Sequence, residues 1–198
     1  MNKLLGVVTL CAALGSGLVG GVLFAFSTFV MGALARLPPS QGLAAMQSIN
    51  VVVINRWFLG PFLATGAVLS VLAVVSLARW SEPGAGLVVL GAALYVIGTL
   101  GLTATYHVPH NERLALLRPE SAEAIAAWLR YVPAWTAWNH VRAATAFLAA
   151  AALTLSLIRR AEHGQRARIT SSPSCEEPAM PRPQRMALGV SPKPCNLV

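Results

Sequence analysis

The stretch AGLVVLGAALYVIGTLGLTATYHVPHNERLA, residues 85–115, decides how this chain folds. Its first part is free of charge over roughly the 20 residues that a helix needs to cross a bilayer. Its second part, from Thr105 to Ala115, brings together two histidines, an asparagine, a glutamate and an arginine. We therefore expect a membrane-spanning helix that ends in a cluster of ionisable groups.

The composition places the whole chain in the same class. Of the 198 residues, 56% are hydrophobic and 11% are charged, whereas a soluble domain carries about 25% charged residues. So little charge cannot cover a globule with a wetted surface, which predicts a membrane protein. Aspartate is absent, so any mechanism that needs an aspartate is excluded.

Four apolar stretches are long enough to span a membrane, at about residues 4–34, 57–77, 86–106 and 138–158. The first is far longer than the roughly 7–15 apolar residues of a signal peptide, so we expect it to be retained. The predicted fold class is therefore an all-α integral membrane protein, a four-helix transmembrane bundle formed by residues 1–160. We expect short interfacial helices in loops one and three and a disordered C-terminal tail.

The predicted tail, residues 161–198, is rich in Pro, Ser and Arg and has no apolar periodicity. From Arg159 onward, seven basic and three acidic residues supply +4 of the net charge of +8. A basic tail beside a span is typical of the cytoplasmic side or of contact with anionic lipid. We expect the lipid bilayer as a partner and no nucleic acid, and the sequence does not predict an oligomeric state.

An even number of spans places both chain ends on one side of the membrane. The two longer connections, about residues 35–56 and 107–137, then share the other side, which we call the loop face. Six Lys or Arg residues lie near each face, so the positive-inside count is tied. The clustered tail bases favour cytoplasmic termini, and we expect a bacterial-type inner (plasma) membrane.

Two packing patterns accompany the spans. Residues Ala13, Gly17, Gly21 and Ala25 form a four-residue stripe of small side chains in the first span, which predicts close approach of another helix. In loop one, Leu43 and Met46 lie at helical spacing. In loop three, Trp128 belongs to another group of apolar residues at helical spacing. We expect these two short helices to lie in the membrane interface, the one in loop three with its apolar side down.

Polar residues from three segments converge on the loop face. The candidate catalytic residues are His107, His110, His140 and Arg142, and the candidate substrate-binding residues are Asn50, Asn55, Asn111, Trp135, Trp138 and Asn139. On a helix Trp135, Trp138, Asn139 and Arg142 share one face through steps of three and four, and His140 points elsewhere.

Each of these residues also has a structural interpretation. The tryptophans fit an interfacial aromatic belt, the two earlier asparagines fit turn caps, the histidines fit solvated helix ends, and Arg142 could snorkel to the head groups. His107 and His110 with a distant His140 do not have a recognised metal-ligand spacing, so we expect no metal.

The order of these motifs resembles the anthrone-oxygenase-like family of small four-span membrane proteins, long filed as a domain of unknown function. The resemblance rests on "MQSIN" with an asparagine before span two, then "HVPHNERLA", then "WNHVR" after spaced Trp and Tyr residues, and covers about residues 4–158. Typical members read NVPLN where this chain reads HVPHN, so His107 and His110 depart from the pattern. The resemblance implies oxidation of an anthrone by O2 without a cofactor.

Two hypotheses follow. In the first, the chain is a cofactor-independent monooxygenase that acts on an apolar polycyclic phenolic substrate. A histidine would remove a proton, amides or Arg142 would hold the oxyanion, and tryptophans would stack on the rings. In the second, it is a non-enzymatic four-helix membrane protein that binds a small ligand or lipid at its polar loop face. The residues leave both open.

Overall fold

The computed structural model describes residues 3–171, and within them every regular element is helical. The chain divides into two units, Met1–His163 and Gly164–Val198. The first unit contains the bundle and all the contacts considered below. Within the described residues, four helices are long and apolar enough to cross a membrane, so the prediction of an all-α four-helix membrane protein is confirmed.

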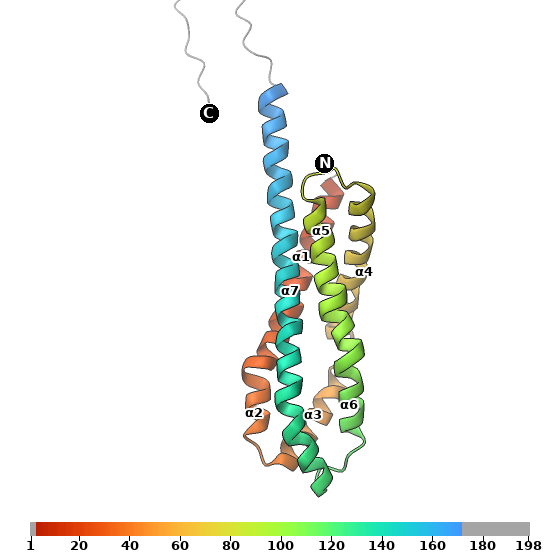
Figure 1. The fold of residues 1–198 in the computed structure, drawn as a ribbon, viewed down its shortest axis with the longest axis vertical. Coiled ribbons are helices and arrows are strands. Elements are labelled where there is room, and N and C mark those ends of the chain that lie inside the picture. Colours follow the sequence, from red (N-terminus) through yellow and green to blue (C-terminus); the bar gives the residue numbers. More distant parts are fainter. Residues whose placement is uncertain (1–2, 172–198) are drawn as a thin grey trace, which may run out of the picture. The chain divides into compact units, whose positions relative to one another are not determined.

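The four long helices correspond to the four predicted spans (Figure 1). The first comprises α1 (Lys3–Ala25), η1 (Phe26–Val30) and α2 (Met31–Ala35). The second is α4 (Arg56–Ala78). The third comprises α5 (Ala85–Ala93), η2 (Leu94–Gly101), η3 (Thr103–His107) and α6 (Val108–Ala115), and the fourth is α7 (Ala122–Ser171). The η segments are π-helical, so their backbone hydrogen bonds reach one residue further than in an α-helix.

The predicted connection of residues 107–137 is mostly helix. α6 continues the third span as far as Ala115, and α7 begins at Ala122, where the Ser121 hydroxyl caps it by accepting from the amide of Ala124 at 3.1 Å. The short helix that we predicted in loop three is therefore the first part of the fourth span. At the other end, α7 runs to Ser171, so the prediction of disorder is wrong for residues 161–171. The rest of that prediction, residues 172–198, lies outside the described part of the chain.

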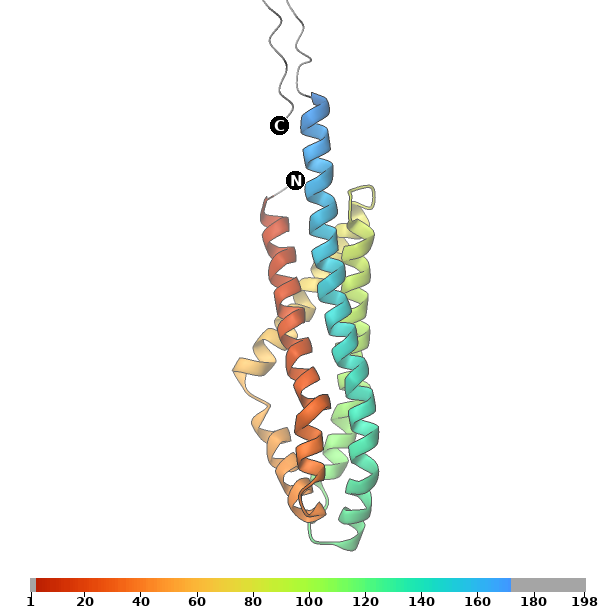
Figure 2. The same cartoon turned by 90° about the vertical axis from the view of Figure 1, so that its left-hand side faces the viewer.

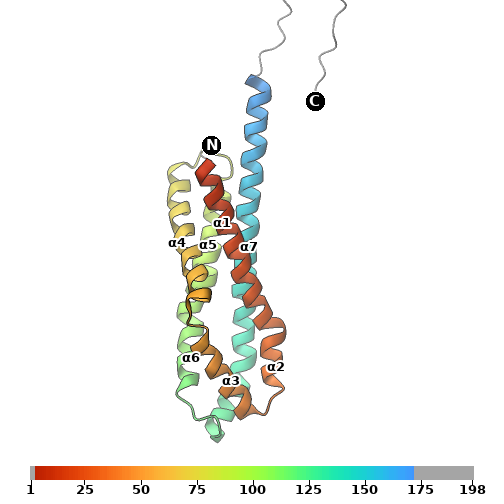
Figure 3. The same cartoon turned by 180° about the vertical axis from the view of Figure 1, so that it is seen from behind.

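The helix predicted in loop one is present as α3 (Pro39–Val52), and it lies between α2 and α6 (Figure 3). Its apolar side packs against protein. Leu43 and Met46 are buried together with Trp128 in a second hydrophobic core, separate from the one between the four spans. Burial against protein satisfies these side chains as well as lipid would, and it fixes α3 to the loop face.

Small residues let the long helices approach closely, but at other positions than we predicted. A Cβ atom added at Gly17 or Gly21 would meet no atom within 4 Å, so the predicted close approach is wrong at these two positions of the stripe. At Gly98 the added atom would lie 2.6 Å from the side chain of Thr145 on α7. At Gly15 it would overlap the hydroxyl of Thr65 on α4. Both glycines are packing positions between neighbouring spans.

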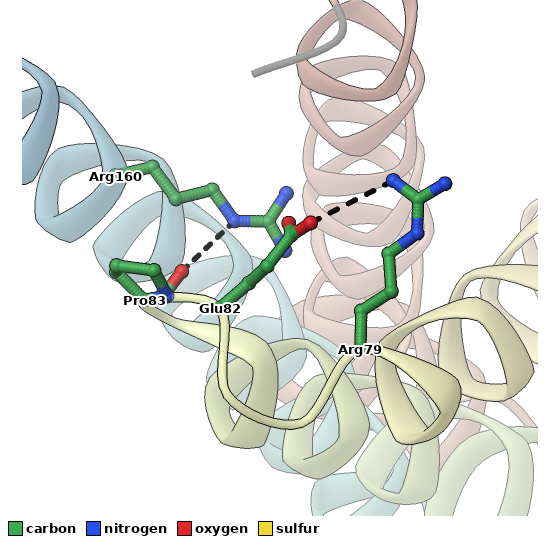
Figure 4. A network of polar contacts seen from close by, with 4 residues as sticks. All are labelled: Arg79, Glu82, Pro83 and Arg160. Carbon is green, nitrogen blue, oxygen red and sulfur yellow. Dashed lines mark hydrogen bonds and ion pairs between the residues drawn. The ribbon is translucent and has the colours of Figure 1, made fainter.

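The two ends of the bundle differ in their polar chemistry. The connection between α4 and α5 lies at the same end as the start of α1 (Figures 1 and 2). There Arg79 pairs with Glu82 at 3.6 Å, and Arg160 donates from Nε to the carbonyl oxygen of Pro83 at 3.2 Å (Figure 4). The opposite end holds α3, α6 and the first part of α7, and it carries the amides, imidazoles and indoles that we predicted to converge.

Candidate functional site

Asn111 on α6 is the centre of one hydrogen-bond network. Its Nδ2 donates to Oδ1 of Asn50 on α3 at 3.0 Å. Its Oδ1 accepts from the hydroxyl of Tyr131 at 2.7 Å and from Nε1 of Trp135 at 3.1 Å, both on α7. One amide therefore connects α3 with α6 and α7, and it fixes the orientation of two aromatic rings.

A second network lies deeper in the bundle around Arg142. Its Nη1 donates to the hydroxyl of Thr103 at 3.1 Å, and its Nη2 donates to Oδ1 of Asn139. Asn139 in turn donates from Nδ2 to the carbonyl oxygen of Leu23 and to Oγ of Ser27, each at 2.7 Å. The arginine is 6% exposed, so it does not snorkel to the head groups.

Arg142 is a buried cation without an acidic partner among the described residues, where the ion pair that occurs is Arg79 with Glu82. Its Nε also lacks a hydrogen-bond partner. Burying a charge is costly unless other groups replace its hydration. Here the substitutes are neutral oxygens and the ring of Trp135, whose centroid lies 5.4 Å from the guanidinium carbon. The positive charge is therefore held in place but not neutralised.

His107 also contacts the indole of Trp135. Its ring meets Trp135 edge to face at a centroid distance of 5.2 Å. Its Nδ1 lies 3.2 Å from the carbonyl oxygen of Leu102, five residues earlier, which matches the π-helical register of η3. A carbonyl only accepts, so Nδ1 carries the hydrogen, and Nε2 presents a lone pair that has no partner in the bundle.

His110 differs from His107 in that it borders a cavity. Its Nδ1 lies 2.7 Å from the carbonyl oxygen of Tyr106, so the neutral ring again carries its hydrogen on Nδ1 and its lone pair on Nε2. The ring stacks on Tyr106 at a centroid distance of 4.1 Å and an angle of 25°. His110 therefore presents a base with a fixed orientation.

The cavity lies between α6 and α7 and has a volume of about 440 Å³, within the range of about 300–1,000 Å³ typical of small-molecule sites. Its lining combines three aromatic side chains, the His110 imidazole, two arginines and small apolar groups, namely Tyr106, His110, Arg113, Leu114, Leu117, Ala127, Arg130, Tyr131, Ala134 and Trp135. A flat aromatic molecule would find ring faces and a base within one space.

Of the predicted site residues, His110 and Trp135 line this cavity. Three others neither line it nor join the contacts around Asn111, Arg142 and Trp135 described above. Asn55 caps α4, because its Oδ1 accepts from the amides of Trp57 and Phe58. His140 is exposed on α7, on the side away from Asn139 and Arg142. Trp138 is 44% exposed and contacts Tyr106 at a centroid distance of 5.4 Å. The structural interpretation of Asn55 as a cap is the one that the geometry favours.

Four residues of the cavity were missed as site candidates: Tyr106, Tyr131, Arg113 and Arg130. Tyr131 had a usable signal, because it lies four residues before Trp135 and so extends the face that also holds Asn139 and Arg142. Arg113 belongs to the ionisable cluster that the sequence shows at residues 105–115, but neither it nor Arg130 was named as a site residue. Among the described residues, no three His, Cys, Asp or Glu side chains lie together as a metal site would require.

These features define a four-helix membrane protein with a buried polar centre and an aromatic cavity at one end. A family model described as anthrone oxygenase matches residues 51–152, more than half of the chain, and the chain belongs to this family. The match includes "HVPHNERLA" and "WNHVR", and it begins at Val51, directly after "MQSIN". No curated protein and no solved structure matches the chain.

Proposed function

We propose that this protein oxidises a flat aromatic ketone of the anthrone type with O2, in the cavity between α6 and α7. The observation that carries the proposal is the placement of His110: its ring lines the same cavity as Tyr106, Tyr131 and Trp135, and the contact of its Nδ1 with the carbonyl oxygen of Tyr106 leaves Nε2 as the basic atom. Membership of the anthrone oxygenase family supports the same reaction class. The substrate rings stack on the aromatic side chains.

The reaction requires a base and an oxyanion environment. An anthrone has an acidic CH2 group beside its ring system, and His110 takes one of its protons to leave an enolate. The enolate carbon bonds to O2, and the proton held by His110 completes a hydroperoxide. Loss of water from that hydroperoxide gives the quinone. One anthrone and one O2 thus give one anthraquinone and one water, so no external reductant is needed.

Arg142 acts on this reaction from a distance. It does not line the cavity, but it lies against the ring of Trp135, which does. A fixed positive charge in a dry bundle lowers the energy of a nearby anion more than it would in water. We propose that Arg142 favours the enolate and that Asn139, by accepting from it, keeps the charge in position as a positioning residue.

The function is tested by purifying the protein in detergent and following anthraquinone absorbance together with O2 uptake. We expect one O2 consumed for each quinone formed, with activity retained after treatment with chelators. His110→Gln should lower kcat by about 100-fold or more, whereas His140→Gln, at an exposed histidine outside the cavity, should leave it unchanged. Absence of turnover above the detergent control would refute the proposal that the protein oxidises anthrone.

A non-enzymatic role is the alternative, and the network of Asn111 favours it in one respect. That amide connects α3, α6 and α7 and would stabilise the loop face in a protein that only binds a ligand. The same purification distinguishes the two, because a binding protein would retain the anthrone unchanged. We also propose that both termini are cytoplasmic and that the protein lies in a bacterial-type inner membrane.

A further inference from the structure

We propose that the cavity selects aromatic substrates that carry an acidic substituent, most simply a carboxylate, and that Arg113 and Arg130 bind this group. The inference rests on the proposed function, since it names the substrate class of the same site. The two arginines line the cavity from different helices, Arg113 from α6 and Arg130 from α7. They are exposed, whereas Trp135 is buried.

The two charged side chains that line the cavity, apart from the His110 imidazole, are both arginines. No Asp or Glu is among the residues that line it. Neither Arg113 nor Arg130 is within ion-pair distance of an acid in the described part of the chain, although Glu112 is adjacent to Arg113 in sequence. Behind Trp135 lies Arg142, a third cation without an acidic partner. A cavity with uncompensated positive charge attracts an anionic ligand.

The position of the charges sets the orientation of the ligand. The aromatic lining and His110 suit an uncharged ring system, whereas the two exposed arginines suit a group that stays near water. Guanidinium groups match a carboxylate geometrically, because their planar N–H donors pair with both oxygens. An aromatic acid would therefore insert its rings against Trp135 and Tyr106 and leave its carboxylate between α6 and α7 at the exposed arginines.

Equilibrium binding tests this without requiring turnover. The probes are anthraquinone-2-carboxylate and its neutral carboxamide, which have the same ring system, and binding is followed by quenching of tryptophan fluorescence in detergent. We expect the carboxylate to bind about tenfold more tightly than the carboxamide to the wild-type protein. Arg113→Gln and Arg130→Gln should each reduce this ratio. Arg118→Gln, an exposed arginine between α6 and α7 that does not line the cavity, should leave the ratio unchanged.

Equal affinities in the wild type, no binding of either probe, or a ratio that survives both substitutions would overturn the inference. Phospholipid supplies the other common anion near a membrane, so the titrations are repeated with phosphatidylglycerol in the micelles. If the two substitutions weaken binding of this lipid but leave the preference for the carboxylate intact, the arginines bind head groups and the inference fails. Turnover of anthrone without any preference for the carboxylate would refute this inference but not the proposed oxygenase function. A preference for the carboxylate without turnover would support the binding site and refute the oxygenase function.

Discussion

At the scale of single residues, the energetics of the site depend on Arg142 and the groups around it. The guanidinium has exchanged its hydration for Thr103, Asn139 and the Trp135 ring, and no acid compensates its charge in the described residues. Removing one partner of a buried charge leaves that charge uncompensated, which costs more than the lost hydrogen bond alone. The stability of the bundle should therefore respond strongly to substitution of Asn139.

Asn139→Ala removes the acceptor of Arg142 and both donors to α1 and η1. We expect it to destabilise the protein by about 2–4 kcal/mol, measured as a lower midpoint of thermal unfolding in detergent. His140→Ala is the matched control, because the neighbouring side chain is exposed, and it should leave the midpoint unchanged. Similar midpoints for the two variants would show that the network does not hold the charge.

The sequence predicted the polar side chains of this network on α7, but not the groups on other helices to which they bond. Asn139 and Arg142 could be placed on one helix face from their spacing, and Arg142 stood out because a charge inside a span is costly. The carbonyl of Leu23 and the hydroxyl of Thr103 could not be found in this way. Which backbone carbonyl or small hydroxyl meets a side chain depends on the rotation and spacing of whole helices, which a single sequence does not specify.

At the scale of elements, the third span is held against α7 by close contact and by hydroxyl groups. Thr99 on η2 lies 3.1 Å from the hydroxyl of Thr145, and Gly98 next to it leaves room for the Thr145 side chain. The π-helical segments η2 and η3 occur in the same stretch as Tyr95, Thr99 and His107, all buried. Such segments are common at functional sites because they redirect side chains.

Gly98→Ala tests this contact. Although alanine favours a helix over glycine by about 1 kcal/mol, the new methyl group would lie 2.6 Å from Thr145. Overpacking of this kind costs about 1–3 kcal/mol, so we expect a lower unfolding midpoint in detergent. Gly17→Ala adds the same methyl group where no atom lies within 4 Å, and it should be neutral or stabilising. A neutral Gly98→Ala would mean that α7 can move aside.

The sequence was enough to predict that the four long helices exist, but it did not predict where they begin and end. The apolar runs gave all four spans, but polar residues such as His110 and Asn111 suggested a loop where the helix continues. They remain helical because their polar groups find partners there: Asn111 bonds to α3 and α7, and His110 bonds to the carbonyl oxygen of Tyr106 on η3. Likewise Trp128 was interpreted as facing the membrane interface, whereas a second core beneath α3 buries it.

At the scale of the whole molecule, the four-span topology brings the candidate residues together. Gln47 on α3 donates from Nε2 to the carbonyl oxygens of Leu114 and Leu117 at 2.9 and 3.0 Å, so the first connection contacts the end of α6. Even span number alone predicted that these connections would share a face. The tied count of basic residues could not predict which side of the membrane that face occupies.

Cysteine labelling in membrane vesicles resolves both the topology and the orientation. With Cys11, Cys175 and Cys195 replaced, single cysteines at Ser81 and Glu120 should react with a membrane-impermeant maleimide from opposite sides. Both positions lie outside the regular helices, one between α4 and α5 and the other between α6 and α7. We expect Glu120→Cys to react from the periplasmic side. Labelling of both from one side would contradict the four-span arrangement, and labelling of Glu120→Cys from the cytoplasmic side would reverse the proposed orientation.

The central claim is that His110 deprotonates an aromatic ketone bound in the cavity between α6 and α7. The most direct test is to mix the purified protein with anthrone in the absence of O2 at neutral pH and record the absorbance of the bound ligand. We predict the long-wavelength band of the enolate with the wild-type protein and with His140→Gln. His110→Gln should still bind anthrone, seen by tryptophan quenching, without forming the band. An equally strong band with His110→Gln, or bound anthrone without any band in the wild type, would contradict the claim.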